Sequence, residues 1–314
     1  MWDKQDSANS GIDRLAGAAE TFIKQERWSR RWTNLLKLAV IAYILFTLVM
    51  IGQRFAPTGD AGLTPEHTAV IKLDGAIMPN SPNSAEVFNA LLRDAFASEQ
   101  AKAVLIRANS PGGSPVQSAL INDEIKRLKQ KHNKPLYVVV EDVCASGCYY
   151  IAVAADEIYA NKGSIVGSIG VRMDTFGFTQ LMDKVGIENR SMHAGEHKSF
   201  IDPFGPKDKA GRAFFKERIL ERTHQQFIET VRQGRGDRLK ETDNTFTGLV
   251  WLGDEAVEHG LIDGLGDVGF VARDKVGTQQ WQTYETERSF VEDLMNNIGA
   301  QTAAQLHQYL YTLK

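Results

Sequence analysis

Three short apolar runs, separated by segments with helical spacing, limit this chain to a small set of folds. Residues 69–73, 103–106 and 136–140 each have the length and composition of a buried strand. Ser84 and the loop ending at Ser114 each precede a segment whose apolar residues recur at helical spacing. A strand–helix–strand order requires parallel pairing with right-handed crossovers. We therefore expect an α/β fold in which a parallel sheet is flanked by helices.

Length and composition narrow the class of protein further. The chain has 314 residues, 43% of them hydrophobic, so it can bury at least one substantial core. Its net charge of −3 argues against general binding of nucleic acid. No Gly-rich phosphate loop and no His/Glu cluster with metal-ligand spacing occurs in the sequence. We therefore expect no cofactor, no metal and no nucleic-acid partner.

The chain has two cysteines, Cys144 and Cys148. Two are too few for a disulfide framework or a zinc site. Their four-residue spacing places them on one face of a helix, and we interpret them as small buried thiols that contribute packing only.

An apolar run near the N-terminus predicts a membrane anchor. No residue from Leu38 to Gly52 is charged, and with Leu35, Leu36 and Lys37 the run reaches about 18 residues, within the roughly 17–25 that a membrane helix needs. A cleaved signal peptide is the alternative interpretation. The run lies far from the N-terminus, however, and no small-x-small cleavage site follows it, which favours a retained transmembrane helix.

Positive charges around this run predict its orientation. Several precede or begin it, and Arg54 alone lies close behind it. The positive-inside rule then puts the N-terminus in the cytoplasm and the rest of the chain, from about residue 53, outside it. The charges before or within the start of the run are Lys24, Arg27, Arg30, Arg31 and Lys37.

Further elements are expected along the rest of the chain. Residues 157–160, 165–171 and 187–193 are predicted strands, and residues 178–185 and 207–233 are predicted helices. After about residue 275 the chain is polar, with two stretches of helical character.

The strand at 136–140 leads into the residues that carry the chemistry. Ser146 lies between Ala145 and Gly147, before an Ala- and aromatic-rich segment that reads as a buried helix. A serine at a strand-to-helix turn can expose its hydroxyl beside free backbone N–H groups of the first helical turn. Such N–H groups suit a developing oxyanion. Capping of the helix by Ser146 is the simpler alternative.

A second loop is expected at the same edge of the sheet. Because parallel strands deliver the loops at their carboxyl ends to one edge, the loop containing Gly112 and Gly113 should lie near Ser146. Paired glycines let backbone N–H groups approach a substrate closely. The pair is therefore a candidate oxyanion hole.

A serine nucleophile also needs a base. His132, His193 and His197 are candidates, with Asp142 or Asp202 as the residue that orients the imidazole. Lys198, in a loop after a predicted strand, is the other candidate. An exposed lysine cannot act as a base, because at a reference pKa near 10.4 only about one in 2500 is neutral at pH 7. Lowering the pKa of the lysine to roughly 7 would need desolvation worth about 4–5 kcal/mol. Residue chemistry alone does not choose between lysine and histidine.

The sequence contains four characteristic segments, 109–114 (NSPGGS), 145–150 (ASGCYY), 167–171 (GSIGV) and 195–199 (GEHKS). Asp202-Pro203-Phe204 and Gly260-Leu261-Ile262-Asp263 accompany them. Together these segments resemble the signal peptide peptidase A (SppA) family of serine proteases, from about Val70 to Gly266. The length and single anchor resemble the short, single-domain form and its SohB-type relatives.

This resemblance implies roles for five residues. Ser146 would be the nucleophile, Lys198 the general base, and Ser168 a hydrogen-bond partner of the lysine amine. By analogy with the related ClpP/crotonase-type fold, the N–H groups of Gly113 and Gly147 would form the oxyanion hole. The two cysteines lie outside the family pattern.

The resemblance also implies the activity and the assembly. The expected protein is a membrane-anchored Ser/Lys endopeptidase that cleaves membrane-derived peptides, such as remnant signal peptides, with small or aliphatic residues at the cleavage site. Short-form members form dome-like rings in which neighbouring subunits complete each site, so we expect a homo-oligomer. The alternatives are a non-catalytic scaffold that binds a membrane partner and an acyl-CoA enzyme on the same fold. The expected organisation is a cytoplasmic tail (1–34), a transmembrane helix (35–53), a linker (54–67), a Ser/Lys peptidase domain (68–275) and a helical C-terminal extension (276–314).

Overall fold

The computed structural model describes residues 35–47 and 65–285. The chain divides into two compact units, residues 1–64 and 65–314. In the first unit, residues 35–47 form a helix whose side chains are largely exposed. No helix within the described ranges is both long and apolar enough to cross a membrane. The remainder of the predicted transmembrane segment (48–53), the predicted tail (1–34) and most of the linker (54–64) lie outside the described residues.

The second unit is built on a mostly parallel sheet, as the strand–helix rhythm predicted. Its main path runs β6-β5-β3-β2-β1-β8, and β4 and β7 continue from β3 on a side branch. Every pairing is parallel except β5 with β6. The strands are β1 (His67–Asp74), β2 (Ala101–Ser110), β3 (Leu136–Ala145), β4 (Glu157–Ala160), β5 (Ile165–Gly167), β6 (Val250–Leu252), β7 (Gly264–Leu265) and β8 (Trp281–Tyr284).

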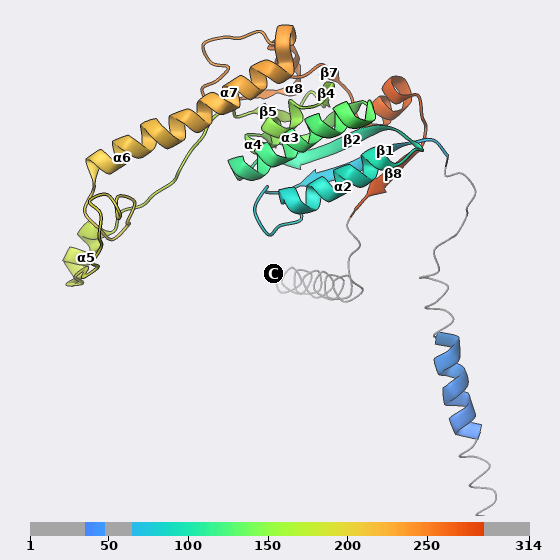
Figure 1. Ribbon diagram of the computed structural model, residues 1–314, viewed down its shortest axis with the longest axis horizontal. Helices are drawn as coiled ribbons and strands as arrows, with labels where there is room; N and C mark the ends of the chain where they lie inside the picture. Colours follow the sequence, from blue (N-terminus) through green and yellow to red (C-terminus); the bar gives the residue numbers. More distant parts are fainter. Residues whose placement is uncertain (1–34, 48–64, 286–314) are drawn as a thin grey trace, which may run out of the picture. The chain divides into compact units, whose positions relative to one another are not determined.

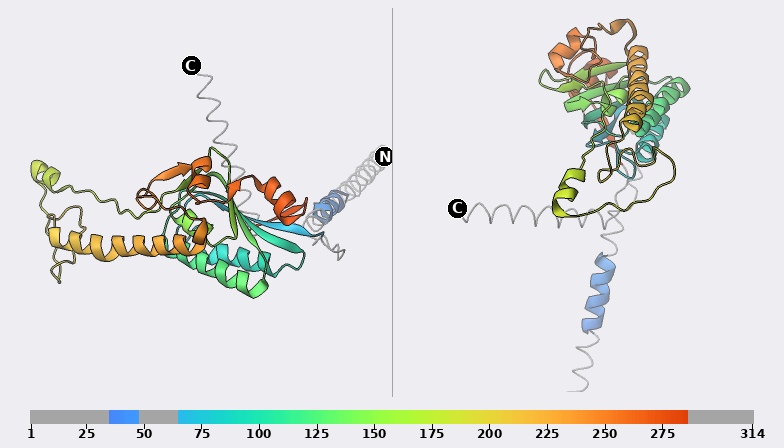
Figure 2. Two further views of the ribbon diagram at one scale, coloured as in Figure 1. Left: turned by 90° about the horizontal axis from the view of Figure 1, so that it is seen from above. Right: turned by 90° about the vertical axis from the view of Figure 1, so that its left-hand side faces the viewer.

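Helices cover the sheet and extend beyond it (Figure 1). Helices α2 and α3 lie over β1 and β2, and short helices near the end of the described chain lie on the opposite side (Figure 2). The α-helices are α2 (Ala85–Ala97), α3 (Pro115–His132), α4 (Gly147–Ala152), α5 (Thr179–Val185), α6 (Lys209–Phe215), α7 (Arg222–Arg235), α8 (Gly253–Glu258) and α9 (Val268–Phe270).

The alternation of side chains along the strands creates two cores. Ile71 and Ile106 belong to the larger cluster, which includes Phe88 of α2 and Ile121 of α3. Their neighbours in the strands point the other way, and form a smaller cluster that includes Val271. The central strands are therefore apolar on both faces, as expected for a parallel sheet covered on both sides. This rigid sheet carries the loops that form the candidate site.

The structure corrects two predictions about secondary structure. Residues 187–193 are exposed and irregular, not a strand, because they have no neighbouring strand with which to pair. Residues 281–284, expected within a helical extension, form β8 and pair in parallel with β1 at the edge of the sheet. The β-type composition of the Trp-Gln-Thr-Tyr segment fits this edge position. The rest of the helical extension expected over residues 276–314, from residue 286 onward, lies outside the described residues.

Helices α6 and α7, joined by one π-helical turn (Lys216–Glu221), form a long rod that leads away from the sheet (Figure 1). Its position agrees with the helix predicted over residues 207–233. Near the far end of the rod lies α5, which ends at Gly186 with a left-handed φ of 73°. We call residues 172–215 the arm. Most side chains of the arm are exposed.

Candidate active site

Ser146 occupies a strained turn between β3 and α4. Its φ of 54° and ψ of −122° lie in a region that non-glycine residues rarely adopt and that costs of order 1–3 kcal/mol. The Ser146 hydroxyl makes no capping hydrogen bond to α4, so helix capping does not explain the serine. Its backbone is instead held on both sides, because its N–H donates to the Gly167 carbonyl at 2.9 Å and its carbonyl accepts from Tyr150 N–H at 3.0 Å.

The glycine loop lies against this turn, as predicted. Gly112 accepts a 2.9 Å hydrogen bond from Ile77 N–H, and Ser114 N–H donates to the Ile77 carbonyl at 2.8 Å. A Cβ atom on Gly112, whose φ is +95°, would lie 2.6 Å from the Gly147 nitrogen and 2.8 Å from the Ser146 Cβ. Glycine is therefore required at residue 112 for the two loops to meet. The next residue, Gly113, is exposed at the pocket.

Ser168 follows Gly167 and also has a left-handed backbone, with a φ of 52°. Its N–H donates to the Leu249 carbonyl at 2.8 Å. The Gly167 carbonyl accepts the hydrogen bond from the Ser146 N–H. Ser168 is the next residue in the chain, so this main-chain bond holds it near the nucleophile candidate. Two serines that are 22 residues apart (168 − 146) thus share one site.

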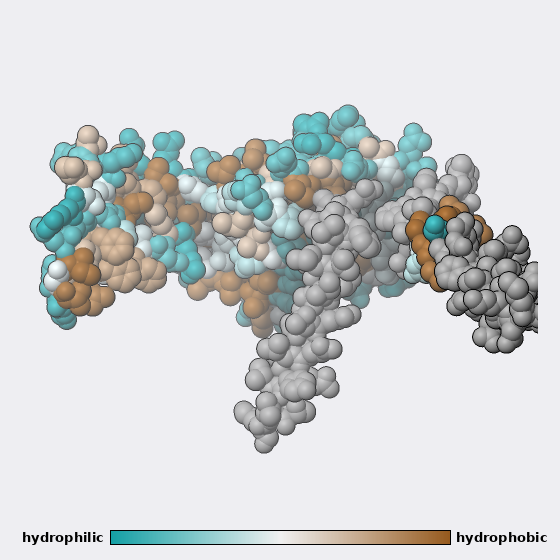
Figure 3. Space-filling model, turned by 90° about the horizontal axis from the view of Figure 1, so that it is seen from below, coloured by the Kyte–Doolittle hydropathy of each residue, from teal (hydrophilic) through white to brown (hydrophobic). Residues whose placement is uncertain are grey.

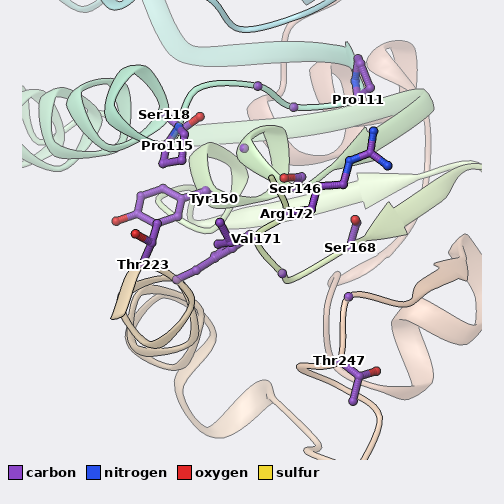
Figure 4. Close-up of a pocket in the computed structure, with 16 residues that line it drawn as sticks. Pro111, Pro115, Ser118, Ser146, Tyr150, Ser168, Val171, Arg172, Thr223 and Thr247 are labelled. Carbon is purple, nitrogen blue, oxygen red and sulfur yellow. The ribbon is translucent and has the colours of Figure 1, made fainter. Parts of the chain in front are cut away.

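These loops surround a cavity of about 710 Å³ (Figure 4). Ser146, Ser168, Gly113 and Gly147 all line it, so four of the five predicted site residues are brought together. Arg172 carries the one charge among the described lining residues, and it is paired with Asp174 at 3.2 Å. The remaining lining residues are Pro111, Gly112, Pro115, Ser118, Tyr150, Gly170, Val171, Thr223, Phe227, Thr247 and Gly248.

Lys198, the fifth predicted site residue, lies away from the cavity within one chain. It is exposed in the arm, and it does not line the cavity. Its loop is fastened to α6, because His197 Nδ1 lies 2.8 Å from the Asp208 carboxylate and the rings of Phe200 and Phe215 are 5.4 Å apart. Asp208 raises the pKa of His197 through this hydrogen bond.

None of the three candidate histidines lines the cavity either. His193 Nε2 lies 3.4 Å from the Ser199 hydroxyl within the arm, and His132 lies at the end of α3 beside Phe96. The triad alternative therefore lacks a histidine at Ser146 within the described part of one chain.

The structure corrects the interpretation of the cysteines. Cys144 and Cys148 form a disulfide, with both side chains fully buried. The spacing argument assumed that both cysteines lie on one helix. Cys144 instead lies next to the end of β3 and Cys148 lies in the first turn of α4, so the chain reverses direction between them and brings the two sulfur atoms together.

Sequence reasoning missed most of the cavity wall. Tyr150, four residues after Ser146, could have been placed on the same face of α4. Thr223 and Phe227 come from α7, and Thr247 from the loop before β6. Nothing in the sequence near these residues indicates a site, because they reach the cavity only through tertiary packing. Where α7 packs on α4, for example, the rings of Tyr150 and Phe227 are 5.2 Å apart.

The fold and the site define an α/β protein with a strained serine in a cavity bordered by glycine loops. The model of peptidase family S49 matches residues 128–279, which include Ser146, Ser168 and Lys198. A Synechocystis protein named as a protease is 31% identical over 210 residues, covering 65% of this chain and 71% of its own. This chain belongs to peptidase family S49, and the resemblance to the SppA family is confirmed.

The matches to other relatives cover smaller parts of those proteins. Protease 4 of Haemophilus influenzae is 32% identical over 206 residues, covering 64% of this chain and 33% of its own. A Brucella abortus protein is 44% identical over 213 residues, covering 66% of this chain. Its name describes a Na⁺/H⁺ antiporter, and the match covers only 29% of it. The chain thus spans less than a third of the length of that relative.

Among solved structures, a mutant of the 1510-N membrane-bound stomatin-specific protease in complex with a substrate peptide is 17% identical. The match covers 75% of this chain and 99% of that one, with a TM-score of 0.43.

Proposed function

We propose that this protein is a membrane-anchored serine endopeptidase with Ser146 as nucleophile and Lys198 of a neighbouring subunit as general base. One observation carries the proposal: Ser146 has a strained backbone in a cavity that it shares with Gly113, Gly147 and Ser168. A scaffold protein needs neither the strained turn nor the glycines that allow the loops to meet. Membership of a peptidase family supports the same reaction.

The proposed reaction proceeds in two stages. The Ser146 hydroxyl attacks the scissile carbonyl while Lys198 Nζ takes its proton, and the N–H groups of Gly113 and Gly147 donate hydrogen bonds to the oxyanion. Lys198 then protonates the leaving amine, which leaves an acyl group on Ser146. Water, deprotonated by the same lysine, hydrolyses this acyl-enzyme and regenerates the hydroxyl. The Ser168 hydroxyl holds and orients the lysine amine.

The position of Lys198 within one chain supports the proposal that a neighbouring subunit supplies the base. A general base must come within hydrogen-bond reach of the proton it removes. Within one chain Lys198 lies in the exposed arm, fastened to α6 and not to the sheet. Docking of the arm on a neighbouring chain would enclose the amine, and removal from water disfavours the ammonium form of a lysine.

The surface of the arm supports such docking. Large apolar side chains are exposed along it, and Figure 3 shows brown patches among the teal ones. Exposed large apolar side chains of this kind are typical of a protein interface. The most exposed are Phe176 (73%), Leu181 (56%), Val185 (60%), Ile187 (57%), Met192 (97%) and Phe214 (60%).

The proposed location is the extracytoplasmic face of the cytoplasmic membrane, with the N-terminus in the cytoplasm. The charge asymmetry around residues 35–53 supports this orientation. The Cys144–Cys148 disulfide supports it independently, because disulfides persist mainly in oxidising compartments. The proposed substrates are membrane-derived peptides, such as remnant signal peptides. A reporter fused after residue 60 should be active only outside the cytoplasm, and cytoplasmic activity would contradict this location.

A serine-directed fluorophosphonate tests the activity. The solubilised full chain should react with the probe and cleave an extended apolar peptide. Ser146→Ala should lose both properties and keep its circular dichroism spectrum. Ser81→Ala is the matched control, because the Ser81 hydroxyl donates to the local Met78 carbonyl and Ser81 does not line the cavity. A parent chain that neither reacts nor cleaves would favour the scaffold alternative.

A further inference from the structure

The Cys144–Cys148 disulfide closes a ring whose middle residue is Ser146. Its five residues are the last two of β3, the nucleophile candidate and the first two of α4. The chain contains no other cysteine. The crosslink lies symmetrically around Ser146, the residue with the strained backbone, so we look for its role in this turn.

Both ends of the ring are fixed in the core. Cys144 is fully buried in β3, where it pairs with Ser110 of β2 on one side and Val166 of β5 on the other. Cys148 is fully buried in the first turn of α4. The bond therefore ties the end of the central strand to the start of the helix across the turn that holds Ser146.

Global stability does not account for this bond. The entropy that a crosslink removes from the unfolded chain grows with the length of the loop it closes, and a five-residue ring is near the short limit. Packing does not require it either, because two reduced thiols would fill nearly the same buried volume without a covalent bond. What the ring restricts is the set of φ and ψ angles open to Ser146.

Apart from the disulfide, hydrogen bonds and close contacts restrain the turn. The Ser146 N–H is held by the Gly167 carbonyl, the Ser146 carbonyl accepts from the Tyr150 N–H, and Gly147 lies close to Ser118, whose hydroxyl would lie 2.4 Å from a Cβ at residue 147. Loss of the covalent tie would let the turn relax toward ordinary backbone angles. The Ser146 hydroxyl and the Gly147 N–H would then move relative to Gly113, and a displacement of about 1 Å can reduce a rate by about 100-fold.

We propose that the Cys144–Cys148 disulfide positions the nucleophile, so that peptidase activity requires the two cysteines to be oxidised to the disulfide. This inference rests on the proposed function. A dithiol such as dithiothreitol would transfer two electrons and two protons to the bond, giving two cysteine thiols and its own cyclic disulfide. The reduced chain keeps its fold and loses most of its turnover. An oxidised, extracytoplasmic enzyme is active, and a copy retained in a reducing compartment is held at low activity.

The bond itself is tested by alkylation of the denatured full chain. Because the chain has two cysteines, no adduct should form before reduction and two should form after it. Adducts without prior reduction, in protein taken from an oxidising compartment, would overturn the proposal.

Its role is tested by the double variant Cys144→Ala/Cys148→Ala. We expect kcat, and the rate of labelling by the fluorophosphonate, to fall about 10- to 100-fold, with KM changed less than about 2-fold. Val166→Ala is the matched control, because it removes buried volume beside Cys144 and leaves the crosslink in place. It should lower the melting temperature without a comparable loss of kcat.

Reversibility separates positioning from damage. Dithiothreitol should lower the activity of the parent, oxidised glutathione should restore it, and neither should affect the double variant. A folded double variant with the kcat of the parent would overturn the positioning role. A parent that is inert to the fluorophosphonate while fully oxidised would instead overturn the proposed function, and the positioning role with it.

Discussion

The backbone N–H of Ser146 donates a 2.9 Å hydrogen bond to the carbonyl of Gly167, the residue directly before Ser168. This bond joins the turn after β3 to the end of β5, and it places the two serines at one cavity. Because it is made by main-chain atoms, it remains when either side chain is changed. Variants of Ser146 and Ser168 therefore report on chemistry and not on the assembly of the site.

Ser168→Ala should lower kcat about 10- to 1000-fold, because the proposed role of this hydroxyl is to orient the lysine amine. The KM for a peptide substrate should change little. Steady-state kinetics would separate the two constants, and a variant with the kcat of the parent would remove Ser168 from the proposed mechanism.

Ser146→Ala and Lys198→Ala chains should each be inactive alone and partly active when assembled together. Some interfaces would then carry an intact serine from one chain and an intact lysine from the next. Lys198→Arg should also be inactive, because arginine stays protonated at any working pH. Peptide cleavage by the mixed assemblies measures the effect, and mixed assemblies without activity would contradict a shared site.

Gly112→Ala should abolish turnover, because a Cβ there would lie 2.6 Å from the Gly147 nitrogen, a proposed oxyanion donor. Gly277→Ala is the matched control. Its φ of +77° imposes similar backbone strain, but nothing lies within 4 Å of the added atom. Both variants should lose some stability in thermal unfolding, and only Gly112→Ala should lose labelling by the fluorophosphonate.

Peptides with an acidic residue at the subsite beside Arg172 should be cleaved better than their lysine counterparts. The preference in kcat/KM should be about 2- to 5-fold, because the Arg172 side chain is 87% exposed and solvent screens its charge. Arg172→Glu should reverse the order, and added salt should reduce it in both proteins. A preference that is insensitive to this substitution would show that another residue sets it.

Asp263→Ala should lower the free energy of unfolding by about 3–5 kcal/mol at pH 7, because it leaves the buried Arg235 guanidinium without its carboxylate. Burial by itself raises the pKa of Asp263. Hydrogen bonds from Arg235 and the Ile158 N–H lower the pKa by more than burial raises it, so the net shift is downward. The stabilisation is therefore present above the ordinary carboxyl range and is lost as the pH falls through the lowered pKa.

Urea unfolding of the solubilised full chain at pH 7 and at acidic pH measures this difference. The gap between the parent and Asp263→Ala should narrow in acid. Glu188→Ala, which removes an exposed partner of Arg190, should have little effect at either pH. A gap that is independent of pH would mean that packing, and not the ion pair, accounts for the loss.

The sequence by itself determined the parallel sheet and the place of Ser146. Both depend on local patterns, since an apolar run of strand length followed by Ala145, Ser146 and Gly147 predicts a strand that ends in a tight turn. The glycine loop could be placed beside Ser146 because parallel strands deliver their loops to one edge. The family resemblance added Ser168 as a candidate and chose Lys198 over the histidines as the base, since no local pattern makes either distinction.

Only the tertiary structure decided which residues and segments meet. The pairing of Cys144 with Cys148 depends on the reversal of the chain at Ser146, and residues 281–284 are a strand because the edge of β1 offers them hydrogen bonds. The irregular course of residues 187–193, and the separation of Lys198 from Ser146 within one chain, follow from the arm leaving the sheet. Periodicity records which face of an element is apolar, whereas contacts between elements depend on packing over the whole domain, and a local pattern does not contain them.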